Sequence, residues 1–176
     1  TLGHLVKGYP CIAEVDIGKK AWGHKLWHCE NNLPDIGFNI NVVDYRNAPQ
    51  LGYGFSLAPY TDIPLKAHEK TSRLILRLCW GVAYLSKCFD VRNDPKNIAI
   101  GSHINSFVQF RWYWQLPINK KFRLEPGFSF SHWSNARAAV PNLGLNLVTL
   151  NLGMHFSFTQ KNPSSPPNVD LSLIHI

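Results

Sequence analysis

The stretch VTLNLGMHFSF, residues 148–158, decides the fold class of this chain. Its apolar side chains fall on every second position, and Thr, Asn, Gly, His and Ser stand between them. Successive side chains of a β-strand point to opposite faces, whereas an amphipathic helix needs apolar residues three and four positions apart. The stretch therefore predicts a strand with one apolar and one polar face.

The same period of two recurs in six segments upstream. In each of them one face is apolar and often aromatic, and the other is polar, small or charged. The segments span about residues 9–18, 36–42, 51–58, 74–84, 104–116 and 122–130. Together with 148–158 they predict an all-β, antiparallel fold of about seven strands, because no segment carries the period of a helix.

The apolar faces pack inward in a soluble sandwich and face lipid in an outer-membrane barrel. Two sets of side chains favour the barrel. Charged residues of both signs share the polar face, as expected for a packed lumen: Arg73, Arg77, Arg111, Arg123, Glu14, Asp16 and Glu125. Tryptophans share the apolar face, where membrane barrels place aromatic girdles: Trp80, Trp112 and Trp114. A soluble β-sandwich or a lipocalin-like barrel remains the alternative.

Composition excludes several other classes of protein. The 176 residues carry 45% hydrophobic and 16% charged side chains, which is too apolar for a disordered chain. The longest apolar run, Leu78 to Leu85, is much shorter than a membrane-spanning helix requires. The net charge is +7, but the cations are scattered rather than clustered. This pattern argues against nucleic acid as a partner.

One domain accounts for most of the chain. Residues 1–158 are expected to form a single β-barrel domain, and residues 159–176 lack the period of a strand or helix and are set apart as a non-barrel tail. Single-chain bacterial barrels have an even number of strands. Residues 1–8 are too short to supply an eighth strand, so we expect that a first strand is missing from this chain, and the same count places residues 19–34 on the periplasmic side.

Two segments near the C-terminus carry the candidate catalytic residues. FSHWSNA spans residues 130–136, and PNLGLN spans residues 141–146. The alternation places His132, Ser134 and Asn146 on the apolar face at one end of the last two strands, joined by a hairpin loop. A serine nucleophile needs a base, and the base needs a partner that orients it. The spacing is compatible with such a trio, and equally with polar residues at a membrane interface.

Two other groups of residues are weaker candidates. Ser106 lies on the same face of the neighbouring strand and is a rival nucleophile, but the sequence gives it no partner. A segment with His24, His28, Cys29 and Glu30 could hold a metal. It contains one clean histidine spacing and no second cluster, so no metal site is predicted.

The two C-terminal segments resemble the signature of the PagL-type lipid A 3-O-deacylases, also called acyloxyacyl hydrolases. Further similarity to members from Bacteroidetes-like bacteria extends over about residues 7–158. It is carried by GYPCIAEVDIGKKAWG (8–23), LGYGFSLAPY (51–60), RLCWGVAYL (77–85) and PKNIAIGSHIN (95–105).

The resemblance implies an eight-stranded barrel in the outer membrane of a Gram-negative bacterium, with lipid A or a related acylated lipid as substrate. Carried over, His132 is the general base, Ser134 is the nucleophile and Asn135 helps to bind the oxyanion. Asn146 stands where the best-known enzymes have Glu, and no cofactor is implied. A catalytically inactive barrel with a structural or lipid-binding role is the alternative function, and the oligomeric state is not predicted.

Overall fold

The computed structural model describes residues 2–20, 34–65 and 72–158. A short 3-10 helix, η1 (Leu2–Leu5), precedes seven strands: β1 (Cys11–Lys20), β2 (Asp35–Asp44), β3 (Tyr53–Pro64), β4 (Arg73–Leu85), β5 (Ile104–Pro117), β6 (Phe122–Ser134) and β7 (Leu145–Phe156). Each strand pairs antiparallel with the next along the chain, so the sheet order is the chain order. The predicted all-β fold of seven antiparallel strands is confirmed.

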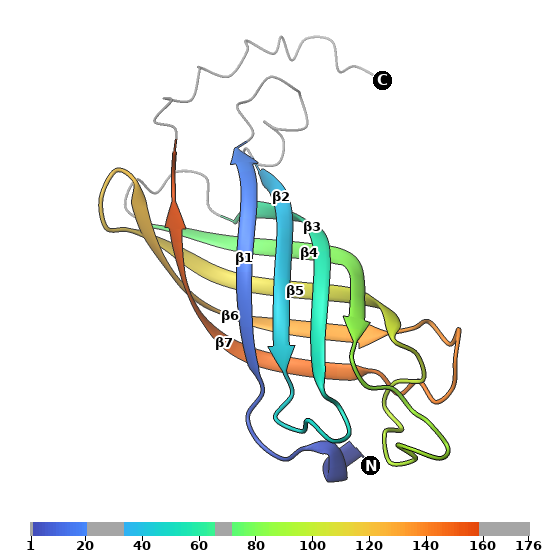
Figure 1. The fold of residues 1–176 in the computed structure, drawn as a ribbon. Coiled ribbons are helices and arrows are strands. Elements are labelled where there is room, and N and C mark those ends of the chain that lie inside the picture. The colour runs from blue at the N-terminus through green and yellow to red at the C-terminus, as the bar shows by residue number, and fades with distance from the viewer. Residues whose placement is uncertain (1, 21–33, 66–71, 159–176) are drawn as a thin grey trace, which may run out of the picture.

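The sheet curls strongly, so that β1 to β3 lie across β4 to β7 as a half-barrel (Figure 1). Within the described ranges, β1 and β7 are the two edges of the sheet and pair only on their inner sides. The metal-candidate segment around His24 and His28, most of the 19–34 connection and the tail 159–176 lie outside the described residues. No helix among the described residues is long and apolar enough to cross a membrane.

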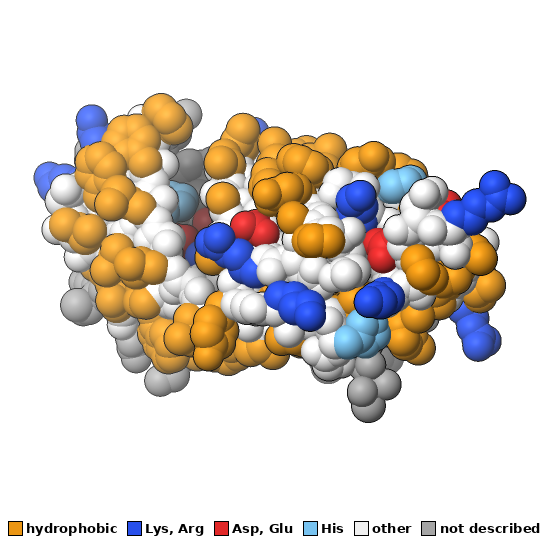
Figure 2. Space-filling model, turned by 60° about the horizontal axis from the view of Figure 1, so that its bottom comes forward, with side chains coloured by type: hydrophobic (Ala, Val, Ile, Leu, Met, Phe, Trp, Pro, Cys, Tyr) orange, Lys and Arg blue, Asp and Glu red, His pale blue; other side chains and the backbone are white. Residues whose placement is uncertain are grey.

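The convex face of the sheet is apolar. Even-numbered positions of β2 and β4 to β7 and odd-numbered positions of β1 and β3 point outward, as the alternation predicts. Exposure reaches 73% at Trp80 and 92% at Leu150, and hydrophobic side chains line most of the outline of the molecule in Figure 2. Contiguous exposed apolar surface of this extent is typical of a protein that faces lipid.

The concave face encloses an apolar core at the end where the loops 45–52, 86–103 and 135–144 gather. Trp133 is fully buried there and packs against Phe107 and Tyr45, with ring centroids 5.3 and 5.8 Å away. Its indole Nε1 donates to Ser56 Oγ on β3 at 3.1 Å. The indole thus links β6 to the opposite wall and fixes which side chains of β6 point inward.

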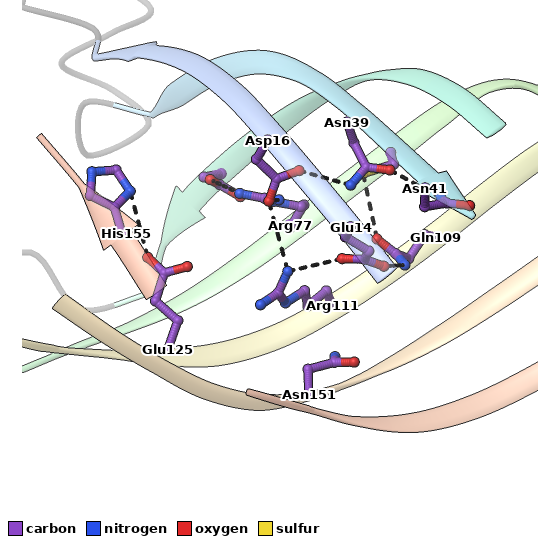
Figure 3. Close-up of polar contacts among 12 residues, drawn as sticks. Glu14, Asp16, Asn39, Asn41, Arg77, Gln109, Arg111, Glu125, Asn151 and His155 are labelled. Carbon is purple, nitrogen blue, oxygen red and sulfur yellow. Dashed lines mark hydrogen bonds and ion pairs between the residues drawn. The ribbon is translucent and has the colours of Figure 1, made fainter. Parts of the chain in front are cut away.

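Farther along the strands, the concave face carries a buried ion-pair network (Figure 3). Arg77 donates through Nε and Nη2 to the two carboxylate oxygens of Asp62 at 2.7 and 2.8 Å, and through Nη1 to Asp16. Arg111 Nη1 donates to Glu14 at 3.1 Å. Because each buried cation meets carboxylates, the network offsets the desolvation that an unpaired charge would suffer.

The network differs in part from its sequence-based expectation. Asp62 was not expected in it, since the predicted strand stopped at residue 58, whereas β3 continues through Pro59 to Pro64. Arg73, expected in the lumen, lies at the start of β4 and is exposed. Glu125 is buried as expected but accepts from Gln115 at 3.1 Å instead of pairing with an arginine.

Candidate active site

The inward position of Trp133 sets the geometry of the site. Neighbouring residues on a strand point to opposite faces, so His132 and Ser134 both point outward and are half-buried. They lie within the last three residues of β6, at the end of the sheet where the β6–β7 loop begins. The structure therefore places both side chains on the apolar convex wall, as the alternation of the sequence predicts.

His132 is held by a residue from the neighbouring strand. The register of β6 and β7 pairs His132 directly with Asn146, and His132 Nδ1 lies 2.7 Å from Asn146 Oδ1. A carbonyl oxygen only accepts, so this contact requires the proton on Nδ1 when the imidazole is neutral. The lone pair of Nε2 is then available to take a proton.

Ser134 lies on the same face, two residues beyond His132. One strand repeat of two residues separates their Cα atoms by roughly 6–7 Å. Among the hydrogen bonds of the described residues, none joins the Ser134 hydroxyl to the imidazole. Catalytic hydrogen bonds of this kind often tighten only in the substrate complex.

Asn135, the residue after the serine, is buried and tied into the loop. Its side-chain Nδ2 donates to Ser102 Oγ at 2.9 Å and to the Ala139 carbonyl at 3.1 Å. Its backbone N–H donates to Asn142 Oδ1 at a longer 3.2 Å. The side chain therefore organises the β6–β7 loop, and the backbone N–H is its donor nearest to the serine along the chain.

The β6–β7 loop begins with an unusual turn. The N–H of Ala138 donates to the carbonyl of Asn135 at 2.9 Å, and the two residues between them, Ala136 and Arg137, both have positive φ (51° and 66°). Non-glycine residues rarely adopt this conformation, and it costs each of them roughly 1–2 kcal/mol. Such local strain persists only where the surrounding structure holds it in place, and it is found most often at functional sites.

The β4–β5 loop, residues 86–103, holds this turn in place. Gly144 N–H donates to the Ala99 carbonyl at 3.0 Å, and Ile100 forms an isolated bridge with Asn142. Together with the Ser102–Asn135 bond, these contacts fix the loop that carries the segment PNLGLN. The loop reaches the site from more than 30 positions away in the chain, so the motif spacing gave no sign of it.

The absence of a side chain at Gly144 leaves space for the imidazole ring of His132. Its φ is +75°, and a Cβ built at this position would lie 2.9 Å from Cε1 of the imidazole and 3.6 Å from Nδ1. Any larger residue would therefore collide with the ring that Asn146 orients. The glycine belongs to the quoted segment PNLGLN, but only the structure shows what it contacts.

Ser106, the rival nucleophile, is Cα-paired with Ser134 across β5 and β6. Its hydroxyl oxygen accepts a hydrogen bond from Trp80 Nε1 at 3.2 Å. An indole N–H is only a donor and cannot act as a base. The partner that the structure gives Ser106 therefore does not activate it.

Metal chemistry has no candidate ligand set among the described residues, where no group of three or more His, Cys, Asp or Glu side chains gathers. Arg77 and Arg111 pair with Asp16, Asp62 and Glu14 and lie on the opposite face of the sheet from His132. The outward trio of His132, Ser134 and Asn146 is thus the arrangement with the residue types of a hydrolase.

Comparison with known proteins identifies the family. The sequence model of the family described as lipid A 3-O-deacylase (PagL) matches residues 16–155. The matched range includes β2 to β6, β7 as far as His155, and the outward residues His132, Ser134 and Asn146. No curated protein and no solved structure matches the chain. Since the family model covers well over half of the sequence, the chain belongs to the PagL family of lipid A 3-O-deacylases.

Proposed function

We propose that this protein is an outer-membrane serine esterase that removes an ester-linked acyl chain from lipid A. One observation carries the proposal: the 2.7 Å contact between His132 and Asn146 on the same outward face as Ser134. The contact orients a base beside a hydroxyl on a wall that faces lipid. Membership of the PagL family supplies the substrate class.

The reaction begins with proton transfer. His132 Nε2 takes the proton of the Ser134 hydroxyl while Oγ attacks the acyl carbonyl carbon, which gives a tetrahedral oxyanion and an imidazolium. Collapse of the intermediate breaks the bond to the sugar oxygen, and the imidazolium returns the proton to that oxygen. His132 then takes a proton from water, the resulting hydroxide attacks the acyl-serine, and the imidazolium returns the proton to Ser134 Oγ as the fatty acid leaves.

The oxyanion needs donors at the loop end of the site. We assign the backbone N–H of Asn135 to this role, because it follows the nucleophile directly and its present bond to Asn142 Oδ1 is 3.2 Å long. A bond of this length is weak enough to be exchanged for a charged acceptor. The Asn135 side chain keeps the loop in shape through Ser102 and Ala139.

Asn146 gives the trio an amide, instead of a carboxylate, as the partner of His132. Its amide oxygen fixes the tautomer of His132, as in the Cys-His-Asn sites of other hydrolases. It carries no negative charge, so it stabilises the imidazolium less than a carboxylate would. We therefore expect a slower reaction than a Glu at this position would support.

The position of the site fits a substrate in the outer leaflet. His132 and Ser134 lie at the end of the sheet that bears the longest connection between strands, 86–103, and the loop 135–144; the opposite end carries the connection 21–34 between β1 and β2 and the 118–121 turn between β5 and β6. Outer-membrane barrels place their longer loops outside the cell. No cofactor is required, because serine and histidine supply nucleophile and base.

The test is deacylation of purified lipid A by the full chain refolded in detergent, read by mass spectrometry as the loss of one acyl mass. Ser134→Ala and His132→Ala should each abolish the loss, and their effects should be strongly non-additive. Ser157→Ala, a serine at the opposite end of the sheet, is the matched control and should behave as wild type. Heat-modified gel mobility confirms that all four proteins are folded.

Full activity of either active-site variant would refute the mechanism. Inactivity of the wild type together with activity of Asn146→Glu would instead identify the natural protein as a barrel that has lost its chemistry, which is the alternative function.

A further inference from the structure

A second set of acid, base and hydroxyl side chains lies at the other end of the sheet, on its concave face. It consists of Glu125 on β6, His155 near the end of β7, and Ser157 directly after that strand. Glu125 pairs across the strands with Gly153, so His155 is its diagonal neighbour on the same face. The mechanism proposed for lipid A uses none of these three side chains.

The imidazole of His155 lies between a carboxylate and a hydroxyl. Its Nδ1 is 3.7 Å from Glu125 Oε1, within ion-pair distance (Figure 3), and its Nε2 is 3.2 Å from Ser157 Oγ. A carboxylate only accepts hydrogen bonds, so it favours the proton on Nδ1 and leaves the Nε2 lone pair for the serine O–H. This is the order of groups in a Ser-His-Glu triad, in which the base contacts both the nucleophile and the acid that orients it.

Groups outside the trio hold its two ends in place. The carboxylate of Glu125 is 8% exposed, and Gln115 Nε2 donates to its Oε1 at 3.1 Å. The backbone N–H of Ser157 donates to the Lys121 carbonyl at 2.9 Å, which ties the serine to the turn between β5 and β6. Support of this kind is what a preorganised catalytic site requires.

Arg123 places a cation beside the trio. It is the cross-strand partner of His155, and Cβ atoms in such a pair are roughly 5 Å apart. Its Nη1 is buried and has no hydrogen-bond partner among the described residues. A buried donor without an acceptor costs free energy, so this guanidinium is suited to an anionic oxygen brought by a ligand. An oxyanion formed at Ser157 is such an oxygen.

The trio borders an open space on the concave face. Glu125, His155 and Ser157 all line a cavity of about 850 Å³, a size typical of small-ligand sites. Charged side chains such as Lys19 and Asp35 line the same cavity, in contrast to the apolar wall around Ser134. This environment favours a short, polar ester over a lipid acyl chain.

We propose that Ser157, His155 and Glu125 form a second hydrolytic site, which cleaves short-chain carboxylic esters dissolved in water. Ser157 Oγ attacks the carbonyl carbon while His155 Nε2 takes its proton, and Arg123 stabilises the oxyanion. The bond to the alcohol oxygen then breaks, and the imidazolium protonates that oxygen. His155 next takes a proton from water, the hydroxide attacks the acyl-serine, and the proton returns to Oγ as the carboxylic acid leaves.

The test uses the full chain carrying Ser134→Ala, refolded in detergent, so that the outward serine makes no contribution. The probe is 4-nitrophenyl acetate, and the release of 4-nitrophenol is followed by absorbance. Adding Ser157→Ala or His155→Ala should lower kcat/KM by about 100-fold or more, the usual effect of a nucleophile or its base. Glu125→Gln should lower it by about tenfold or more, because the histidine loses its acid. Ser106→Ala, an outward serine distant from the trio, is the matched control and should leave the rate unchanged.

A second measurement identifies the nucleophile without turnover. A fluorophosphonate, which phosphonylates activated serines with loss of fluoride, should add its mass to Ser157 in the Ser134→Ala chain, as located by peptide mass spectrometry. Adding His155→Ala should prevent the labelling, and heat-modified gel mobility confirms that the chains are folded. An unlabelled Ser157 in the folded chain, or ester hydrolysis that survives Ser157→Ala, would overturn the proposal. Because Ser134 is absent throughout, failure of the lipid A reaction would leave this result unaffected.

Discussion

The contact between Gly144 and His132 makes a direct prediction about Gly144→Ala. The added Cβ would lie 2.9 Å from Cε1 of the imidazole, whereas carbon atoms rest at roughly 3.5–4.0 Å. The ring must therefore shift by roughly 0.5–1 Å, because the backbone at 144 is anchored to the Ala99 carbonyl. The shift moves Nδ1 relative to Asn146 and Nε2 relative to Ser134.

The expected loss is catalytic rather than structural. A misplacement of about 1 Å costs a reacting pair about 100-fold, so the kcat of Gly144→Ala should fall by about 10- to 100-fold. The positive φ of +75° adds a folding cost of roughly 1–2 kcal/mol for a non-glycine residue. Replacing any glycine in this conformation carries that folding cost, and the cost does not by itself impair the site.

Gly52→Ala is the matched control. Gly52 has a φ of +61°, and its added Cβ would meet Ser86 and Lys87 instead of the imidazole. Both variants should unfold more easily, and only Gly144→Ala should lose most of its kcat in the lipid A assay at equal folded concentration. An unchanged kcat in Gly144→Ala, or an equal decrease in Gly52→Ala, would show that this contact does not position His132.

Three further predictions address the partner of His132, the interior and the wall. Asn146→Ala should lower the deacylation rate, and Asn146→Glu should preserve or raise it through the added charge; an Asn146→Ala variant as fast as wild type would show that His132 is oriented by another group. Arg77→Met leaves Asp62 buried without its cation and should lower the free energy of unfolding by about 3–5 kcal/mol, measured by denaturant titration; a loss below about 1 kcal/mol would mean that the network contributes little. Leu152→Arg on the lipid-facing side of β7 should cost about 2–4 kcal/mol in bilayers, and the inward Asn151→Arg should cost less; equal costs would contradict a lipid-facing wall.

The alternation of side chains was sufficient to predict the strands and their faces. It also predicted that His132 and Asn146 share the outward face at one end of the last two strands, and the register of β6 and β7 then pairs them directly. Both results depend on the strict two-residue repeat of a strand, which leaves each side chain only two directions.

Other parts of the structure depend on information that the repeat does not contain. The predicted strand ended at residue 58, yet β3 continues through Pro59 to Pro64, so Asp62 was not expected beside Arg77. The bond between Trp80 and Ser106 joins residues on neighbouring strands diagonally, at a sequence distance that gives no pattern. The turn of Ala136 and Arg137 has positive φ without glycine, a conformation that local residue preferences oppose, and the loop 86–103 contacts the residues on either side of it, Asn135 and Asn142.

If His132 and Ser134 act as proposed, their outward direction determines how the protein meets its substrate. The reacting groups would open onto the plane of the membrane, and a lipid would reach them by lateral diffusion among its neighbours. The concentration that governs the rate is then the number of substrate molecules per unit area. Inert lipid or detergent added at a constant total amount of substrate should slow the reaction in proportion to the dilution of the surface, as in other reactions confined to two dimensions.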